Sequence, residues 1–286
     1  MKKVLILGYK GNLGSQLVKV FQDGYEVVGW DRENVDITNE ELLKKKITDL
    51  SPDIIINAVA YNAVDRCEEG EDDYQKALML NRDAVGNLAD ICKDIDALLI
   101  HYSTDYVFSG NIDKQEFNED EKPNPINKYG ESKYLGEQEI LKRSNLKYYL
   151  IRTSKLFGPK GASKLVKPSF FDMMINLSKD KSELEIVNEE KSFFTYTVDL
   201  AKETRKLIDQ KKEYSIYHIF NTESATWYES ALELFKILEK DILVKPVTGD
   251  KFPRPAKRPE YSLLTNTKLE PLRSYQEALK EYLCEE

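Results

Sequence analysis

The residue types with the clearest potential for chemistry are a tyrosine and a lysine four positions apart, Tyr129 and Lys133, in the stretch YGESK. Residues four apart share one face of a helix, so a helix would place the phenol hydroxyl beside the ammonium group. A free phenol has a pKa of about 10, and a neighbouring cation stabilises the phenolate and lowers that pKa. The pair is therefore a candidate acid/base unit. Two side chains on a solvated helix face would have the same spacing, but of the 17 tyrosines only Tyr129 has a lysine four residues later.

The start of the chain has the pattern of a dinucleotide-binding turn. Residues 3–7 form a short apolar run, typical of a strand buried in a parallel sheet, and residues 15–21 are amphipathic. Between them lies GxxGxxG, formed by Gly8, Gly11 and Gly14. Glycines let the backbone approach a pyrophosphate, which would sit on the free amide groups of the helix N-terminus. Glycines also occur in ordinary turns, so the position directly after the first strand is what favours a nucleotide site.

A second predicted strand, residues 25–30, ends at Asp31 and Arg32. A carboxylate there can accept hydrogen bonds from ribose hydroxyls and favours NADH, whereas an arginine can bind the extra phosphate of NADPH. Both cofactors therefore remain open, and a surface ion pair is the alternative to a nucleotide contact. Asp36 and Ile37 are predicted to follow in a loop where they could touch the adenine.

The third predicted strand, residues 53–57, is followed by small residues at 58–60, which would let a cofactor pack against the main chain. A long helical pattern at residues 73–92 comes next and carries Asn81, for which we expect at most a supporting role. Asp65 is interpreted as a residue at a helix start on the surface.

The next predicted strand, residues 97–102, leads to Thr104 and Asp105. Ligands of open α/β sheets bind at the carboxyl ends of the strands. Thr104 could donate a hydrogen bond to a carbonyl oxygen, and Asp105 could accept one from a sugar hydroxyl. His101 is expected to be packed, and the chain has only two histidines and no cluster with metal-ligand spacing. Neither a His-based triad nor a metal site is predicted.

Composition narrows the class of protein. A chain of 286 residues is enough for one large domain or two closely joined ones, and its formal net charge of -8 argues against a general nucleic-acid surface. Three cysteines without a CxxC pair fit a reducing cytoplasm better than a disulfide framework. No apolar run approaches the ~20 residues that a membrane span requires, and no export signal is found. We therefore expect a cytoplasmic protein with no nucleic-acid partner and no membrane partner.

Several motifs together resemble a known family. The glycine turn, HYSTDYVFSGN at residues 101–111 and YGESK at residues 129–133 are similar to those of extended short-chain dehydrogenases/reductases. More narrowly, they resemble the dTDP-4-dehydrorhamnose reductase family. Similar stretches at residues 152–154, 226–228 and 255–259 extend the resemblance over nearly the whole chain.

The resemblance implies an α/β fold with a Rossmann-type doubly wound parallel sheet and a smaller, discontinuous α/β substrate-binding lobe. The expected dinucleotide-binding domain comprises residues 1–154 plus about 196–221, where a helix and a strand would return to the sheet. The substrate-binding lobe would comprise residues from about 155–195 plus 222–286.

The resemblance also implies roles for the candidate residues. Tyr129 would protonate the carbonyl oxygen of the substrate, Lys133 would lower the pKa of Tyr129 and hold the nicotinamide ribose, and Thr104 would hydrogen-bond the same oxygen. Asp105 would line the sugar site. The residues predicted to line NADPH or NADH, from the patterns above and from the resemblance, are Gly8, Lys10, Gly11, Asn12, Leu13, Gly14, Asp31, Arg32, Asp36, Ile37, Ala60, Tyr61, Asn62, Tyr102, Tyr129 and Lys133.

The second half of the chain departs from the family's pattern. Lys155 stands where the family usually has a tryptophan that contacts the substrate, and a lysine lacks that stacking face, although its ammonium could bind a phosphate or hydroxyl. Ser169 replaces an asparagine, residues 163–167 resemble a small insertion, and residues 189–195 keep little of the usual pattern. Altered substrate specificity and loop drift without functional meaning are both compatible with these departures.

A basic loop at residues 251–259 could bind the diphosphate of a nucleotide sugar, with Arg258 as the first candidate. A solvated loop is the alternative. The acidic end, Glu285 and Glu286, is a candidate homodimer contact, without further support from the sequence.

The predicted activity is an NAD(P)H-dependent reduction of a nucleotide-linked 4-keto-6-deoxysugar, first of all dTDP-4-dehydro-L-rhamnose to dTDP-L-rhamnose for a cell-surface polysaccharide. Two alternatives are a reductase of a different NDP-4-keto sugar and a non-catalytic, nucleotide-binding regulatory subunit of the same fold. Because a pure binder has no need of a tuned phenol, the presence of Thr104, Tyr129 and Lys133 favours the enzyme.

Overall fold

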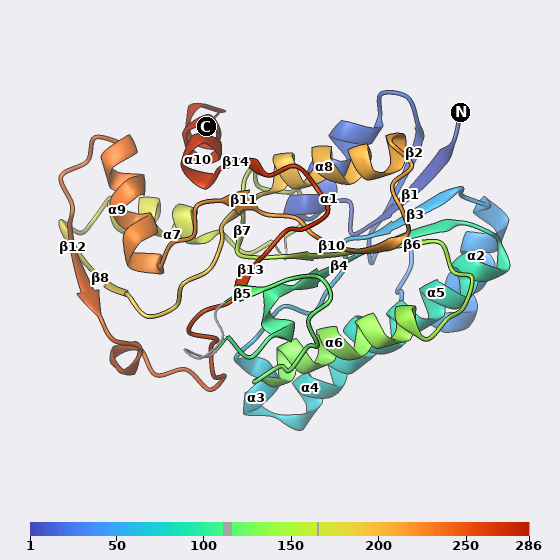
Figure 1. The fold of residues 1–286 in the computed structure, drawn as a ribbon, viewed down its shortest axis with the longest axis horizontal. Coiled ribbons are helices and arrows are strands. Elements are labelled where there is room, and N and C mark those ends of the chain that lie inside the picture. Colours follow the sequence, from blue (N-terminus) through green and yellow to red (C-terminus); the bar gives the residue numbers. More distant parts are fainter. Residues whose placement is uncertain (111–115, 165, 286) are drawn as a thin grey trace.

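The computed structural model describes residues 1–110, 116–164 and 166–285. Its centre is a six-stranded parallel sheet with the strand order β10-β6-β4-β3-β1-β2 (Figure 1). These strands are β1 (Lys3–Leu7), β2 (Glu26–Trp30), β3 (Ile54–Asn57), β4 (Leu98–Thr104), β6 (Tyr148–Thr153) and β10 (Ser215–His218). The predicted doubly wound α/β sheet is confirmed.

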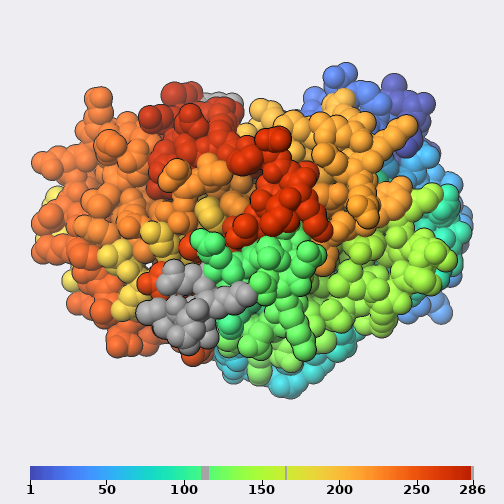
Figure 2. All heavy atoms as spheres, in the orientation of Figure 1, coloured from blue at the N-terminus to red at the C-terminus, as the bar shows by residue number. Residues whose placement is uncertain are grey.

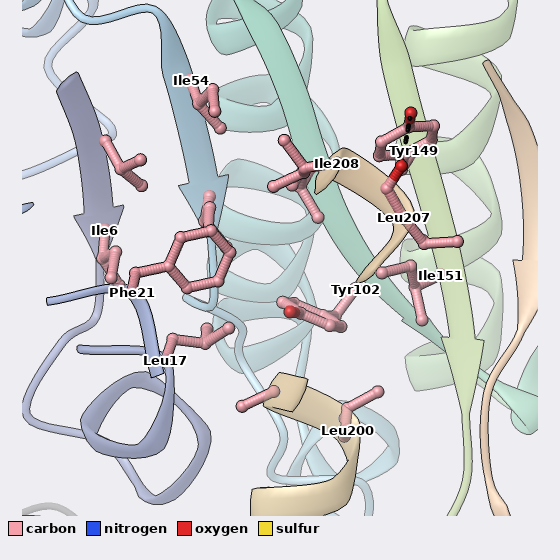
Figure 3. Packing of buried hydrophobic residues seen from close by; sticks show 14 of the residues in the cluster. Ile6, Leu17, Phe21, Ile54, Tyr102, Tyr149, Ile151, Leu200, Leu207 and Ile208 are labelled. Atoms are coloured by element: carbon pink, nitrogen blue, oxygen red, sulfur yellow. Dashed lines mark hydrogen bonds between the residues drawn. The ribbon is translucent and has the colours of Figure 1, made fainter. Parts of the chain in front are cut away.

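Helices cover both faces of this sheet, which explains why its central strands are apolar without interruption. Helices α1 and α8 pack on one face, and α2, α5 and α6 pack on the other (Figure 1). Their bounds are α1 (Asn12–Phe21), α2 (Glu40–Leu50), α5 (Ala84–Asp94), α6 (Lys128–Leu141) and α8 (Thr197–Asp209). Figure 3 shows Leu17 and Phe21 of α1 and Leu200 of α8 beside side chains of the sheet. Each fully buried aliphatic side chain of this kind contributes roughly 1.5–3 kcal/mol to stability.

The strand order reverses its direction at one point of the sheet. β1 lies between β2 and β3, so the chain leaves β1 toward one edge and later returns to its other side. Connections therefore diverge above the carboxyl ends of β1 and β3, and ligands of open α/β sheets bind at such a switch point. The glycine turn follows β1 at this position, and residues 58–60 follow β3.

The predicted helical pattern at residues 73–92 is confirmed, with one π-helical turn inside it. α4 (Glu71–Leu78) and α5 are separated by a single π-helical turn, η1 (Met79–Asp83). Asn81 is fully buried within this turn. Its amide bonds the backbone of a neighbouring loop, and π turns of this kind are frequent at functional sites.

A second, smaller lobe has its own core of aromatic and aliphatic side chains. Its helices are α7 (Phe170–Leu177), α9 (Trp227–Ile237) and α10 (Tyr275–Glu285). Its strands pair two by two: β7 (Leu156–Phe157) with β9 (Thr195–Tyr196), β8 (Glu183–Val187) with β12 (Leu243–Val247), and β11 (Asn221–Thr222) with β14 (Leu272–Ser274). Thr226 caps α9 in a capping box with Glu229.

One pair of short strands joins an early part of the chain to a late one. β5 (Glu116–Phe117) pairs with β13 (Leu263–Leu264), so the late part of the chain, red in Figure 2, lies against the green segment that follows β4. The single-turn elements are α3 (Arg66–Glu69), η2 (Asp105–Val107) and η3 (Gly249–Lys251).

Helix α8 packs against α1, and β10 pairs with β6, so this part of the chain returns to the central sheet. We keep the division into residues 1–154 plus about 196–221 and about 155–195 plus 222–286 as our proposal for the domain boundaries. Asn111 of the long motif, Leu165 of the apparent insertion and Glu286 of the acidic end lie outside the described residues. Within the described ranges, no helix is both long enough and apolar enough to cross a membrane.

Candidate active site

The glycine turn packs too tightly for side chains. A Cβ on Gly14 would lie 2.1 Å from the carbonyl oxygen of Gly8, and Gly8 itself has a φ of 77°, a left-handed value that favours glycine. The Gly11 amide donates to the Gly8 carbonyl at 3.0 Å, which closes the turn ahead of α1. Leu13 points into the core beneath it. This is a backbone cradle at a helix N-terminus, an arrangement that suits a pyrophosphate.

A segment of the second lobe lies directly on this turn. The Gly161 amide donates to Asn12 Oδ1 at 2.8 Å, and the Ser163 amide donates to the Lys10 carbonyl at 2.9 Å. A Cβ on Gly161 would lie 2.3 Å from the Lys10 carbonyl oxygen and 2.5 Å from the carbonyl carbon of Gly11. The two backbones are therefore in contact, and the second lobe buttresses the expected cofactor turn.

We expect the Gly161→Val variant to bind NADPH more weakly, because its side chain would push the glycine turn out of position. Overpacking of this kind costs about 1–3 kcal/mol. If the glycine turn shifts to accommodate the new side chain, the affinity for NADPH should fall roughly fivefold to 150-fold. Titration of NADPH fluorescence would measure the dissociation constant. Ala162→Val, at an exposed neighbouring position, is the matched control and should bind as the wild type does. Equal affinities for the two variants would contradict the prediction.

The residues expected near the adenosine lie at the end of β2. Asp31 Oδ1 accepts a hydrogen bond from the Arg32 amide at 2.7 Å, while the Arg32 side chain is largely exposed. Lys10 Nζ lies 2.5 Å from Glu33 Oε2. Asp36 Oδ1 accepts two hydrogen bonds from Thr38, which lower the pKa of Asp36.

Ile37 is buried in the core, at 5% exposure, so its side chain supports the loop from below. The predicted adenine contact of Ile37 stays a prediction.

The loop after β3 is held by the π-helical turn. Asn81 Oδ1 accepts from the Tyr61 amide at 2.9 Å, and Asn81 Nδ2 donates to the Tyr61 carbonyl at 3.0 Å. The same Nδ2 donates to Ser132 Oγ at 2.9 Å on α6. Ala60 and Asn62 on either side of Tyr61 are exposed. Asn81 thus links the expected cofactor loop to the helix that carries the Tyr/Lys pair.

Tyr129 and Thr104 come together although they are far apart in sequence. Asn127 caps α6 by accepting from the Gly130 amide at 2.7 Å, which sets Tyr129 in the first turn beside the end of β4. There the Thr104 hydroxyl is close enough to form a hydrogen bond that lowers the pKa of Tyr129. Burial, first of all, and the charge of Asp105 act the other way, so the net direction is a raised pKa. The phenol therefore keeps its proton near neutral pH.

The aromatic ring of Tyr106 fixes the other side of Tyr129. The two ring centroids are 6.0 Å apart at an interplanar angle of 76°, an edge-to-face contact.

Lys133 lies on the same helix but points its ammonium toward the sheet. Nζ donates to the Tyr102 carbonyl at 2.6 Å and lies 3.3 Å from His101 Nε2, and the residue is only 2% exposed. This differs from the expected pairing with the hydroxyl of Tyr129, because a buried ammonium requires acceptors and β4 supplies them. Burial lowers the pKa of Lys133 to about 8. His101 is packed, as predicted, and burial together with Lys133 holds the pKa of His101 well below its usual value.

The Tyr102 side chain lies on the other face of the sheet. Its ring packs in the core that Figure 3 shows, and its hydroxyl lies 2.8 Å from Thr204 Oγ1. Only the carbonyl of Tyr102 is therefore directed toward Lys133 and the expected cofactor site.

Asp105 is buried among hydroxyl groups. It is 2% exposed, and its carboxylate accepts hydrogen bonds from the hydroxyls of Ser154, Ser192 and Ser262. The predicted contact of Asp105 with a sugar hydroxyl stays a prediction.

Lys155 is half-buried in an aromatic corner of the second lobe. Its Nζ lies 3.9 Å from the Trp227 ring centroid and 5.0 Å from that of Phe194, and it donates to the Glu190 carbonyl at 3.1 Å. Burial lowers the pKa of Lys155 to about 8. The Trp227 ring thus stacks on the ammonium, and its Nε1 donates to the carboxylate of Glu190.

Arg258 lines a hollow of about 290 Å³ together with Arg254 and Phe252. Its guanidinium bonds Asp65 at 2.7 Å and the Ala256 carbonyl at 2.9 Å. Asp65, interpreted from the sequence as a surface residue, is therefore a partner of the basic loop. Nothing in the sequence indicated that pairing, since the two residues are far apart along the chain.

The fold and the site define an enzyme of the extended short-chain dehydrogenase/reductase type, with the glycine turn at the switch point of the sheet and a Tyr/Thr/Lys group at the adjacent strand ends. The chain belongs to the family described as RmlD substrate binding domain, which matches residues 1–286. The predicted family is thereby confirmed.

Relatives match along the full length. The spore coat polysaccharide biosynthesis protein SpsK of Bacillus subtilis is 33% identical over 290 residues, with 100% of this chain and 98% of that protein covered. A dTDP-4-dehydrorhamnose reductase of Streptomyces griseus is 32% identical over 288 residues, with 97% and 91% covered. The crystal structure of a dTDP-4-dehydrorhamnose reductase from Bacillus anthracis in complex with NADP superposes with a TM-score of 0.92 at 33% identity, with 100% of both chains covered.

Proposed function

We propose that this protein is an NAD(P)H-dependent reductase of a nucleotide-linked 4-keto-6-deoxysugar, with dTDP-4-dehydro-L-rhamnose to dTDP-L-rhamnose as the first reaction to test. The observation that carries the proposal is the convergence of Tyr129 and Thr104 at the carboxyl end of β4, beside the glycine turn. Membership of a family whose relatives include dTDP-4-dehydrorhamnose reductases supports the choice of substrate.

The chain offers a suitable place for the cofactor. The glycine cradle and the N-terminus of α1 would hold the pyrophosphate, Asp31 or Arg32 would meet the adenosine ribose, and Lys133 would meet the nicotinamide ribose. The bound reduced nicotinamide supplies a hydride to the ketone carbon. The buried, protonated phenol of Tyr129 donates its proton to the ketone oxygen, which neutralises the negative charge that develops there. No covalent enzyme intermediate is required.

A reductase of a different NDP-4-keto sugar is the second candidate, and Lys155 favours it. An ammonium held against Trp227 presents a charge where the family usually has an aromatic face. Relatives at comparable identity carry names that refer to other sugars, such as the dTDP-4-keto-6-deoxy-D-glucose reductase of Streptomyces niveus at 31% identity.

The test is to mix the purified protein with NADPH or NADH and 4-keto sugars linked to dTDP, GDP, CDP or UDP. Loss of reduced-cofactor absorbance and the mass of the product would identify the reaction. Oxidation with dTDP-4-dehydro-L-rhamnose would support the first candidate, and oxidation with another sugar only would support the second. Cofactor binding without oxidation of any member of the panel would favour the non-catalytic subunit.

The hollow lined by Arg254 and Arg258 is our proposed site for the diphosphate of the substrate. We expect Arg258→Ala to raise the substrate KM roughly tenfold to hundredfold, because hydrogen bonds to charged groups contribute about 1.5–3 kcal/mol. NADPH affinity should change little. Lys251→Ala, which removes an exposed ion pair with Glu185 in the same loop, is the matched control. Equal losses of substrate and cofactor affinity, or no loss of either, would count against the site.

A cytoplasmic location and a homodimer with a contact at the acidic end of the chain belong to the same proposal. Size-exclusion chromatography with light scattering would test the homodimer.

A further inference from the structure

The basic loop at residues 251–259 is fastened to two residues that belong to the first half of the chain. The Arg258 guanidinium donates to Asp65 Oδ2 at 2.7 Å. One residue earlier in the loop, the main-chain carbonyl of Lys257 accepts a hydrogen bond from Asn127 Nδ2 at 2.9 Å. The loop is therefore held by a side chain at Asp65 and by its main chain at Asn127.

Asn127 is also the residue that begins helix α6. Its Oδ1 accepts from the Gly130 amide at 2.7 Å, and the helix starts at the next residue. Tyr129 is the second residue of α6, so the position of its side chain depends on how this first turn is held. The two ends of one amide, which is 6% exposed, thus contact the helix of Tyr129 and the basic loop.

The residue type suits this double contact. Serine, threonine, aspartate and asparagine all cap helices, because each offers an oxygen to a free amide of the first turn. Among them, asparagine alone adds an NH2 group, which can donate to a main-chain carbonyl. The Gly130 amide is a donor and the Lys257 carbonyl is an acceptor, so only one orientation of the Asn127 amide suits both partners.

The other fastening point of the loop also lies next to the start of α6. Asp65 directly precedes α3, and Glu68 of α3 accepts a hydrogen bond from the Lys128 amide at 2.7 Å. This amide is one of the free donors at the N-terminus of α6. Both attachments of the basic loop therefore lead within a few residues to the turn that carries Tyr129.

We propose that Asn127 is a positioning residue, which sets the loop of Arg258 against the first turn of α6. It fixes the proposed diphosphate site relative to Tyr129, so that a substrate held by Arg258 brings its sugar to the phenol. The inference rests on the proposed function, because it assumes that Arg258 binds the diphosphate and that Tyr129 is the proton donor.

Asn127→Asp tests the inference, because the two side chains have nearly the same shape. A carboxylate still caps α6, but it places an acceptor opposite the Lys257 carbonyl and removes the hydrogen bond to the loop. We expect the KM for dTDP-4-dehydro-L-rhamnose to rise roughly fivefold to hundredfold, with kcat within about threefold of the wild type. Asn127→Ser removes the NH2 group without adding a charge and should give the same result.

Hydrogen exchange of backbone amides tests the inference without turnover. The Ala256 amide donates to Asp65 Oδ1 at 3.3 Å, and it should exchange at least about fivefold faster in Asn127→Asp and Asn127→Ser. Exchange within α6 should stay as in the wild type, because both variants keep the cap. This readout remains valid if the protein reduces none of the sugars, so a failure of the inference is separate from a failure of the proposed function.

Asn39→Asp is the matched control. Asn39 caps α2 by accepting from the Leu42 amide at 3.1 Å and is exposed, so the same substitution there should leave the KM and the exchange of the basic loop unchanged. Wild-type exchange of the loop in both Asn127→Asp and Asn127→Ser would overturn the inference. A wild-type KM in both variants would also overturn it.

A double variant distinguishes positioning of Arg258 from a general loss of structure. If Asn127 acts through Arg258, Asn127→Asp combined with Arg258→Ala should have the KM of Arg258→Ala alone, within about twofold. Losses that multiply in the double variant would show that Asn127 affects substrate binding by another route, and they would overturn the inference.

Discussion

Replacement of Tyr129 by phenylalanine should lower kcat for the reduction by about 10²- to 10⁴-fold, the usual contribution of a positioned general acid. Burial and the charge of Asp105 raise the pKa of Tyr129, so the phenol is protonated over the range in which the protein would work. The variant loses the proton donor but keeps the ring, and its edge-to-face contact with Tyr106 can persist. Single-turnover kinetics would measure the loss, and NADPH should still bind.

Tyr106→Phe provides the control for this prediction. It makes the same chemical change in the neighbouring ring, which the mechanism does not use as an acid. We expect turnover close to that of the wild type. If Tyr129→Phe turned over as fast as Tyr106→Phe, Tyr129 would have no role as the proton donor.

The sheet and its glycine turn could be predicted because their signals are local. An apolar run at residues 3–7 followed at once by Gly8 leaves few alternatives to a buried strand and a tight turn, and the structure has both. The same holds for Thr226, because its capping-box partner Glu229 lies within the same four residues of sequence. Local propensity and tertiary structure agree at these positions.

The details of the site depend on contacts that no local pattern encodes. Ser192 and Ser262 lie 87 and 157 residues from Asp105, and isolated serines have no signature before the chain folds. Lys133 shares a helix face with Tyr129 as expected, yet the direction of its ammonium is decided by the Tyr102 carbonyl on a different element. Spacing predicted which residues gather at the site but not which atoms they contact.

The π turn within the predicted helix at residues 73–92 has a similar cause. Helix propensity favours continuity there, but the Asn81 amide satisfies both backbone groups of Tyr61, and the chain adopts a π turn that places it. A departure from the regular α-helical repeat at a buried polar residue therefore points to a structural role for that residue. Asn81 also bonds Ser132 on the helix of the Tyr/Lys pair.

The stability of α6, the helix that carries Tyr129 and Lys133, depends on a buried ion pair. Disruption of this ion pair should have the largest effect on folding. Arg152 Nε and Nη2 donate to the two carboxylate oxygens of Glu137 at 2.9 and 2.7 Å, and the two side chains are 2% and 0% exposed. Glu137 is one turn beyond Lys133 on α6, and Arg152 is on β6, so the pair fixes the helix to the sheet. The Arg152 guanidinium also stacks on the Phe108 ring at 5.0 Å.

We expect Glu137→Leu to lower the free energy of unfolding by about 3–5 kcal/mol, because it leaves a buried guanidinium without its counter-charge. Urea denaturation would measure the loss. Lys44→Ala is the control. It breaks an ion pair with Asp94 in which the two side chains are 56% and 55% exposed, and it should cost less than about 1 kcal/mol. The double variant Glu137→Leu with Arg152→Met should recover part of the loss, since an apolar pair of similar volume needs no counter-charge. A cost for Glu137→Leu as small as that of Lys44→Ala would show that the pair does not anchor α6.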